Sequence, residues 1–190
     1  MYPKVDEWKK PIHREKLEDK VLYVTCDKLC FKVTKEQSEE ATELKSSQEE
    51  ADIRLLLHAL HAAECGYKSV VITAEDTDVL ILCLGFSINI PSPMFQKCGT
   101  KNRTRFIDIK KLSYALGGSV CDALIGMHTF TGCDTVSAFA GRGKMTTLKQ
   151  MKLDQSYQEA FSQLGASWEV SAELFKKLQA ITCLPPNAQN

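Results

Sequence analysis

The spacing of apolar residues changes along the chain in a way that predicts an α/β fold. From Glu49 to Cys65, apolar side chains recur every three or four residues, which is the period of an amphipathic helix. Gly66 ends this helix, and residues 68–73 then form a short, β-branched, nearly continuous apolar run, typical of a strand buried on both faces. A helix, a glycine turn and a buried strand in succession indicate an α/β fold with a mostly parallel central sheet.

Shorter elements precede and follow this helix and strand. Residues 21–25 and 29–34 are predicted to form the strands of a hairpin, whereas residues 1–20 are expected to be poorly structured. A region containing several glycines and prolines, 85–104, is predicted to be a loop. The remaining periodic segments predict one short strand and four helices, at 106–109, 109–116, 120–130, 155–164 and 170–181.

Net charge alone indicates no particular partner, because 24 Lys and Arg residues balance 24 Asp and Glu residues. The charges are nevertheless segregated, with an acidic stretch at 36–52 and a basic stretch at 97–111. Two solvated faces explain this distribution as well as an acidic, metal-binding cleft beside a track for a polyanion.

The eight cysteines do not have the pattern of a disulfide framework. Cys26 and Cys30 are the only close pair, and we assign them to the hairpin rather than to a zinc site. Four others lie among apolar residues and are predicted to be core side chains: Cys65, Cys83, Cys121 and Cys183. Since no apolar run approaches the ~20 residues of a membrane span, we expect an intracellular protein without a membrane partner.

Carboxylates gather where predicted elements begin or end. Asp76 and Asp78 directly follow the buried strand, where α/β sheets open their ligand crevice, and an extended backbone would direct both side chains to one face. Glu50 and Asp52 stand at the start of the preceding helix, and Asp134 follows the helix at 120–130. Converging carboxylates repel one another unless Mg²⁺ or Mn²⁺ neutralises them, and a pair of such ions can activate water for phosphodiester hydrolysis.

Each acid also has an ordinary structural alternative. Glu50 can complete a capping box with Ser47, and Asp52 can be a first-turn acid that favours the helix dipole. Asp76 can be a turn residue or the N-cap of the next segment, and Asp134 can cap a following helix.

The histidines add one candidate to these acids. His58 and His61 lie three residues apart on the predicted helix and are expected at the edge of the core rather than on a metal. His128, six residues before Asp134, is a candidate for contacting the carboxylates without binding the metal itself.

The order of the motifs resembles the internal region of flap endonucleases and their PIN-like 5′-nuclease relatives. The matching stretches are Glu49-Glu50-Ala51-Asp52, Ile72 to Asp78, Asp122 to Asp134, and Ala140-Gly141-Arg142-Gly143-Lys144. The similarity spans roughly residues 46–150. It implies a PIN-like three-layer fold, followed by a helical region similar to a helix-hairpin-helix, and it favours a nuclear or cytoplasmic location.

The resemblance also implies the site residues. Two Mg²⁺ or Mn²⁺ ions would be held by carboxylates that are also the expected catalytic residues: Glu50, Asp52, Asp76, Asp78 and Asp134. Nucleic-acid phosphates would contact the glycine-rich turn at Gly141, Arg142, Gly143 and Lys144. The basic stretch would add Lys101, Arg103 and Arg105 to that surface. The expected activity is structure-specific, metal-dependent hydrolysis of DNA or RNA.

The chain departs from the family at its beginning. Residues 1–20 do not resemble the family's first strand, which ends in an aspartate, and its arch has no matching segment. We therefore expect a nuclease core at 21–134 that is incomplete at its N-terminus, and a helical extension at 135–190. Two alternatives to an active nuclease remain, namely a catalytically degenerate nuclease-fold module that binds nucleic acid or protein, and a purely structural α/β domain.

Overall fold

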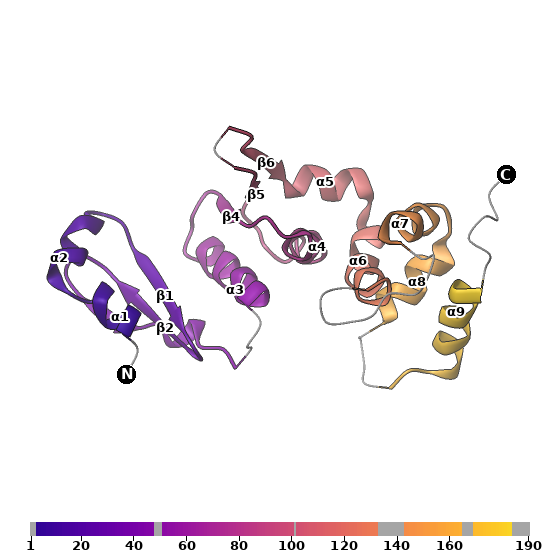
Figure 1. The fold of residues 1–190 in the computed structure, drawn as a ribbon, viewed down its shortest axis with the longest axis horizontal. Helices are drawn as coiled ribbons and strands as arrows, with labels where there is room; N and C mark the ends of the chain where they lie inside the picture. The colour runs from indigo at the N-terminus through magenta and orange to yellow at the C-terminus, as the bar shows by residue number, and fades with distance from the viewer. Residues whose placement is uncertain (1–2, 48–50, 101, 133–142, 165–168, 184–190) are drawn as a thin grey trace. The chain divides into compact units, whose positions relative to one another are not determined.

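The computed structural model describes residues 3–47, 51–100, 102–132, 143–164 and 169–183 (Figure 1). Backbone contacts divide the chain into two compact units, Met1–Ala62 and Ala63–Asn190. Each unit contains a three-stranded sheet together with helices, so the predicted α/β class is confirmed. Among the described residues, no helix is both long and apolar enough to cross a membrane.

The first unit is built on a small antiparallel sheet. Asp27, with a φ of 49°, makes the tight turn that confirms the predicted hairpin. The strands pair in chain order: β1 (Leu22–Cys26), β2 (Leu29–Val33) and β3 (Ser38–Glu40). Two further helices follow the sheet: η2 (Thr42–Leu44) and α3 (Ala51–Glu64), the second of which crosses into the second unit.

The segment expected to be poorly structured instead forms three short helices: α1 (Pro3–Trp8), α2 (Pro11–Arg14) and η1 (Glu15–Leu17). Elements of one or two turns are too short to show an apolar period, which is why the sequence did not predict them. They are held by tertiary contacts, since Val5 is only 1% exposed and the Lys9 ammonium lies 3.8 Å from the centre of the Phe31 ring.

The core of the first unit joins the sheet to α3. Cys30, Ala41 and Leu44 form a buried cluster against which Tyr23 and Leu57 pack. The two histidines of α3 lie at the edge of this core, as predicted. His58 Nε2 is 2.9 Å from the Thr25 hydroxyl, and His61 Nε2 is 3.2 Å from the Tyr23 hydroxyl.

The sheet of the second unit is parallel only in part. Its strands are β4 (Val70–Thr73), β5 (Met94–Cys98) and β6 (Arg105–Asp108). β4 and β5 run parallel, but β5 and β6 run antiparallel because the short turn after Gly99 joins them as a hairpin. The prediction of a mostly parallel sheet is therefore met by one of the two pairings, and β5 occupies what was predicted to be a loop.

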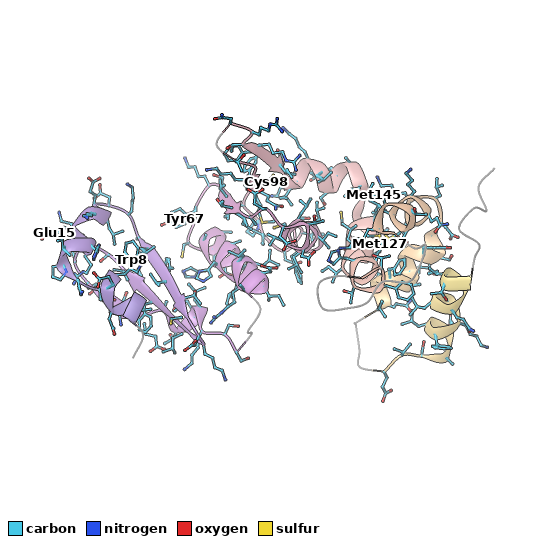
Figure 2. The ribbon with its side chains drawn as sticks, viewed as in Figure 1. Trp8, Glu15, Tyr67, Cys98, Met127 and Met145 are labelled. Atoms are coloured by element: carbon cyan, nitrogen blue, oxygen red, sulfur yellow. The ribbon has the colours of Figure 1, made fainter. Side chains whose placement is uncertain are left out.

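Helices make up most of the rest of the second unit as described: α4 (Thr77–Gly85), α5 (Ile109–Leu116), α6 (Gly118–Phe130), α7 (Lys144–Leu153), α8 (Gln155–Gln163) and α9 (Ala172–Cys183). Gly117, with a φ of 89°, separates α5 from α6 as the sequence predicted. α6 is the central helix and packs against α4, α5, α7 and α8. Met127 of α6 (Figure 2) and Phe161 of α8 are almost completely buried.

The contact between α6 and α8 is unusually close. A Cβ atom added to Gly126 of α6 would lie 2.1 Å from the backbone oxygen of Phe161. The aromatic rings of Phe130 and Phe161 lie 5.5 Å apart beside this point. Glycine is therefore required at position 126 by the approach of a neighbouring backbone rather than by its own dihedral angles.

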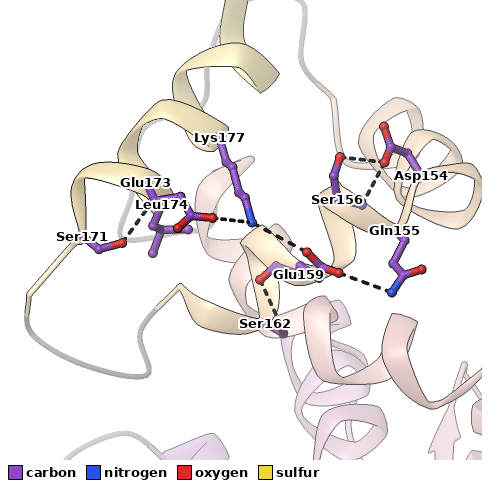
Figure 3. A network of polar contacts seen from close by, with 9 residues as sticks. All are labelled: Asp154, Gln155, Ser156, Glu159, Ser162, Ser171, Glu173, Leu174 and Lys177. Atoms are coloured by element: carbon purple, nitrogen blue, oxygen red, sulfur yellow. Dashed lines mark hydrogen bonds and ion pairs between the residues drawn. The ribbon is translucent and has the colours of Figure 1, made fainter.

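A polar network borders α8 and α9 (Figure 3). The Lys177 ammonium lies 3.3 Å from Glu173 and 3.6 Å from Glu159, so one cation bridges acids of both helices. Asp154 caps α8 by accepting the Ser156 amide at 2.8 Å. Exposed pairs of this kind add little stability. The apolar side chains that α9 buries, Leu174, Leu178 and Ile181, hold it in place more strongly.

The prediction of core cysteines is confirmed at two of the four positions. Cys83 and Cys121 are buried, but Cys65 is exposed, because α3 ends at Glu64 and the chain turns at Gly66. The side chain of Cys183 lies outside the described residues.

Candidate functional site

The acidic segment, residues 74–78, begins where the parallel pairing of β4 and β5 ends. The Ala74 amide donates to the Lys97 oxygen at 3.1 Å, and the chain then leaves the sheet. Asp76 has an extended backbone and its Oδ1 accepts the Asp78 amide at 2.9 Å, so it is the N-cap of α4. The N-cap alternative is therefore confirmed. The expectation of an extended backbone through Asp78 is wrong, because the cap starts the helix at Thr77.

A buried imidazole lies against the second of these carboxylates. His128 of α6 is 7% exposed, and its Nε2 lies 2.9 Å from Oδ1 of Asp78. The approach does not have hydrogen-bond direction, and neither ring nitrogen has a hydrogen-bond partner among the described residues. Burial of an imidazole without complete hydrogen bonding costs free energy. The expected contact between His128 and the acidic site is thus present in the second unit.

A buried carboxamide lies at the same end of the sheet. Gln96 of β5 is 2% exposed, and its Nε2 donates to the backbone oxygens of Ala74 at 3.1 Å and Asp76 at 3.2 Å. Its Oε1 has no hydrogen-bond partner among the described residues. The sequence did not point to Gln96, since this residue lies in a segment predicted to be a loop. Its position in the alternating pattern Met94-x-Gln96-x-Cys98 was the available signal.

The basic hairpin, here the described part of the β5–β6 turn with its flanking strand ends (residues 97–100 and 102–105), is tied to the acidic segment. Both carboxylate oxygens of Glu75 accept the Gly99 amide, at 2.8 and 3.0 Å. Gly99 has a φ of 93°, and a Cβ there would lie 2.2 Å from the Arg103 oxygen, so only glycine fits this turn. The Arg105 guanidinium donates to the Cys98 sulfur at 3.1 Å, and this bond, with a smaller effect from Glu75, raises the pKa of Arg105.

The structure describes only part of the predicted metal site. Asp76 and Asp78 lie together, whereas Glu50 and Asp134 fall outside the described residues. Asp52 lies in the first turn of α3, within the first unit, and its position relative to the acidic segment is not determined.

The predicted nucleic-acid surface is likewise described in part. Arg103 and Arg105 are exposed on the basic hairpin. Gly143 is the N-cap of α7 and Lys144 its first residue. The remaining predicted contacts, Lys101, Gly141 and Arg142, lie outside the described residues.

The donor chemistry of the acidic segment suits a hard divalent cation. Asp76 is exposed and the Asp78 side chain is 28% exposed, so water and ions can reach both carboxylates. Within the described part of the chain, however, no group of three or more His, Cys, Asp or Glu side chains is arranged to hold a metal ion. The two aspartates therefore fit Mg²⁺ or Mn²⁺ in kind but do not form a complete site by themselves.

Comparison with known protein families, curated proteins and solved structures finds no match to this chain. The resemblance to PIN-like nucleases therefore rests on the sequence motifs alone.

Proposed function

We propose that this chain carries a divalent-metal-dependent nuclease site of the PIN-like, flap-endonuclease type, which hydrolyses phosphodiester bonds in DNA or RNA. The observation that carries the proposal is the contact between Asp78 and the buried ring of His128 beside Asp76. A purely structural domain would pack an apolar side chain between α4 and α6 at lower cost, since a buried imidazole with incomplete hydrogen bonding is unfavourable. Holding a carboxylate in a fixed direction is a reason to bear that cost.

The metal would be Mg²⁺ or Mn²⁺, and a pair of ions would activate water and stabilise the leaving oxygen. Asp76 and Asp78 would be ligands, together with Glu50, Asp52 and Asp134 as the resemblance implies. His128 would keep the Asp78 carboxylate turned toward the open side of the site.

The basic hairpin supports a nucleic-acid partner. Arg103 and Arg105 are exposed on it, and the bond between Glu75 and Gly99 fixes the hairpin to the acidic segment. Phosphate groups would thus be bound beside the carboxylates that would hold the metal ions. The start of α7, at Gly143 and Lys144, would hold a further stretch of backbone together with the rest of the glycine-rich turn.

The finer fold belongs to the same proposal. The parallel pairing of β4 with β5 across α4, with acids where β4 ends, favours a PIN-like three-layer core followed by a helix-hairpin-helix-like region. A nuclear or cytoplasmic location would follow from this family resemblance.

A cleavage assay tests the proposal. The full chain is incubated with labelled single-stranded, duplex and flap substrates in Mn²⁺ or in EDTA, beside the double variant Asp76→Asn/Asp78→Asn. Asp154→Asn is the matched control, because Asp154 caps α8 with the same aspartate-to-amide bond as Asp76. We expect cleavage that requires Mn²⁺, is lost in the double variant and persists in the control. Cleavage that is insensitive to EDTA and to both substitutions would refute the proposal.

A second candidate is a catalytically degenerate nuclease-fold module that binds nucleic acid or protein. It is favoured by the absence of a three-residue metal group among the described side chains and by the use of Asp76 as a helix cap. Binding of labelled DNA or RNA without cleavage of any substrate would select this candidate.

A further inference from the structure

We infer that Gln96 is a positioning residue that sets the direction of the Asp76 and Asp78 carboxylates. The inference deepens the proposed function and, as far as metal binding is concerned, rests on it. Ile72 of β4 pairs with Gln96 of β5, so the Gln96 side chain stands beside the last residues of β4, where the acidic segment leaves the sheet.

The Gln96 side chain donates hydrogen bonds to backbone oxygens beyond the point where the pairing of β4 with β5 ends. The pairing of β4 with β5 ends with the Ala74 amide, and the backbone oxygens of Ala74 and Asp76 lie just beyond that point. The carboxamide nitrogen of Gln96 has two hydrogens and donates to both oxygens. Because both neighbours are carbonyl oxygens, only the NH₂ end of the carboxamide can face them, which fixes the orientation of the side chain.

Burial of this carboxamide costs free energy, which favours a role for Gln96 in positioning its neighbours. Gln96 is 2% exposed and its Oε1 is without a hydrogen-bond partner among the described residues. A methionine would fill a similar volume without an orphaned acceptor. Both hydrogen bonds that the side chain donates go to backbone oxygens of the acidic segment. The buried carboxamide therefore restrains the backbone of that segment.

The acidic segment is then held at three separate points. Gln96 holds its backbone, the Gly99 amide holds the Glu75 carboxylate, and His128 lies against Asp78. Of these three, only Gln96 bonds the backbone of Asp76, the residue that caps α4. Loss of its donors releases the cap, and the cap determines where both carboxylates point.

The test compares Gln96→Met with the parent and with Ser87→Ala. Ser87 is a matched control, since it is a buried polar residue just beyond the opposite end of α4 whose hydroxyl donates to the Leu84 oxygen and lies 3.2 Å from the Ser113 hydroxyl. Amide hydrogen exchange is measured at Asp78, whose amide is bonded to Asp76. The Ser156 amide, bonded to Asp154 in the same way, is the internal reference.

We expect Gln96→Met to accelerate exchange at Asp78 by about tenfold or more relative to Ser156, and Ser87→Ala to leave the ratio unchanged. Mn²⁺ affinity, measured by electron paramagnetic resonance, should weaken by about tenfold in Gln96→Met only, equivalent to about 1.4 kcal/mol. If Gln96→Met does not fold, Gln96→Asn is the alternative variant. Its side chain is one methylene shorter, so the amide nitrogen lies farther from both oxygens, and exchange at Asp78 should accelerate in the same way.

Equal acceleration at both amides, or none at Asp78, overturns the inference, because Gln96 would then act on stability alone or not on the segment. A parent protein that binds no Mn²⁺ would count against the proposed function, whereas the exchange ratio would still decide the role of Gln96.

Discussion

Replacing Gly126 by alanine should destabilise the second unit, although alanine is the better helix former. A Cβ at this position would lie 2.1 Å from the Phe161 oxygen and 3.3 Å from Cβ of Leu164. Because the closer atom belongs to backbone, α8 would have to move by about 1 Å. Overpacking costs about 1–3 kcal/mol, and a backbone clash lies toward the upper end, while helix propensity returns at most about 1 kcal/mol. We expect a net loss of about 2 kcal/mol and a melting temperature lower by roughly 5–10 °C.

Two other glycines provide graded controls for this substitution. A Cβ at Gly118, at the start of the same helix, meets nothing within 4 Å, and Gly118→Ala should be neutral or slightly stabilising. A Cβ at Gly85 would lie 2.8 Å from Cδ1 of Ile125, a side-chain tip that can rotate away, so Gly85→Ala should fall between the two. Thermal and urea unfolding of the full chain, followed by far-UV circular dichroism, measures the series. A Gly126→Ala variant as stable as Gly118→Ala would refute the close approach of α6 and α8.

Three further predictions follow from single side chains. Asp76→Ala should lower the free energy of unfolding by about 1 kcal/mol by removing the N-cap of α4, whereas Asp76→Asn should keep the cap and lose Mn²⁺ binding. Thermal melts with and without Mn²⁺ separate these two effects. Equal destabilisation by both substitutions would contradict the cap. Burial, reinforced by nearby positive charge, lowers the pKa of His58 from 6.5, so the unfolded chain binds more protons there and stability should fall as the pH drops below about 6.5. Urea unfolding at a series of pH values in this range measures the effect. The free energy of unfolding should depend less steeply on pH in His58→Gln than in the parent, and an equal pH dependence would exclude His58 as the source. Burial raises the pKa of Cys83 to about 11, so iodoacetamide at about pH 8 should label exposed Cys65 in the native protein and Cys83 only after unfolding, as read by mass spectrometry; equal native labelling would contradict the burial.

The sequence predicted α5, α6, α8 and α9 of the second unit and its strands β4 and β6, but it did not predict α4 or β5. The break between α5 and α6 was visible because Gly117 and Gly118 interrupt the apolar period, and the structure places a positive φ there. β5 was missed for a physical reason. Its buried positions alternate as in any half-buried strand, but the polar Gln96 at one of them weakens the apolar signal, and Pro91, Pro93 and Gly99 around it favoured a loop.

At the acidic site the sequence indicated the residues but not their backbone. Asp76 and Asp78 were expected on an extended chain, because the apolar residues after them could equally continue a strand. The N-cap decides between the two, and it is seen only in the geometry of the Asp76 carboxylate. His128 was a candidate because it lies six residues before Asp134, but its contact with Asp78 in particular depends on how α6 packs on α4, which no local pattern encodes.

The three supports of the acidic segment also bear on the order in which the chain folds. Gln96, Gly99 and His128 come from progressively more distant parts of the sequence, with His128 about fifty residues beyond Asp78. Closing loops of that length carries an entropic cost, whereas successive helices such as α7 and α8 meet through near neighbours. In refolding, helical signal should therefore return early, and the carboxylates should reach their final directions only in the last and slowest step of assembly.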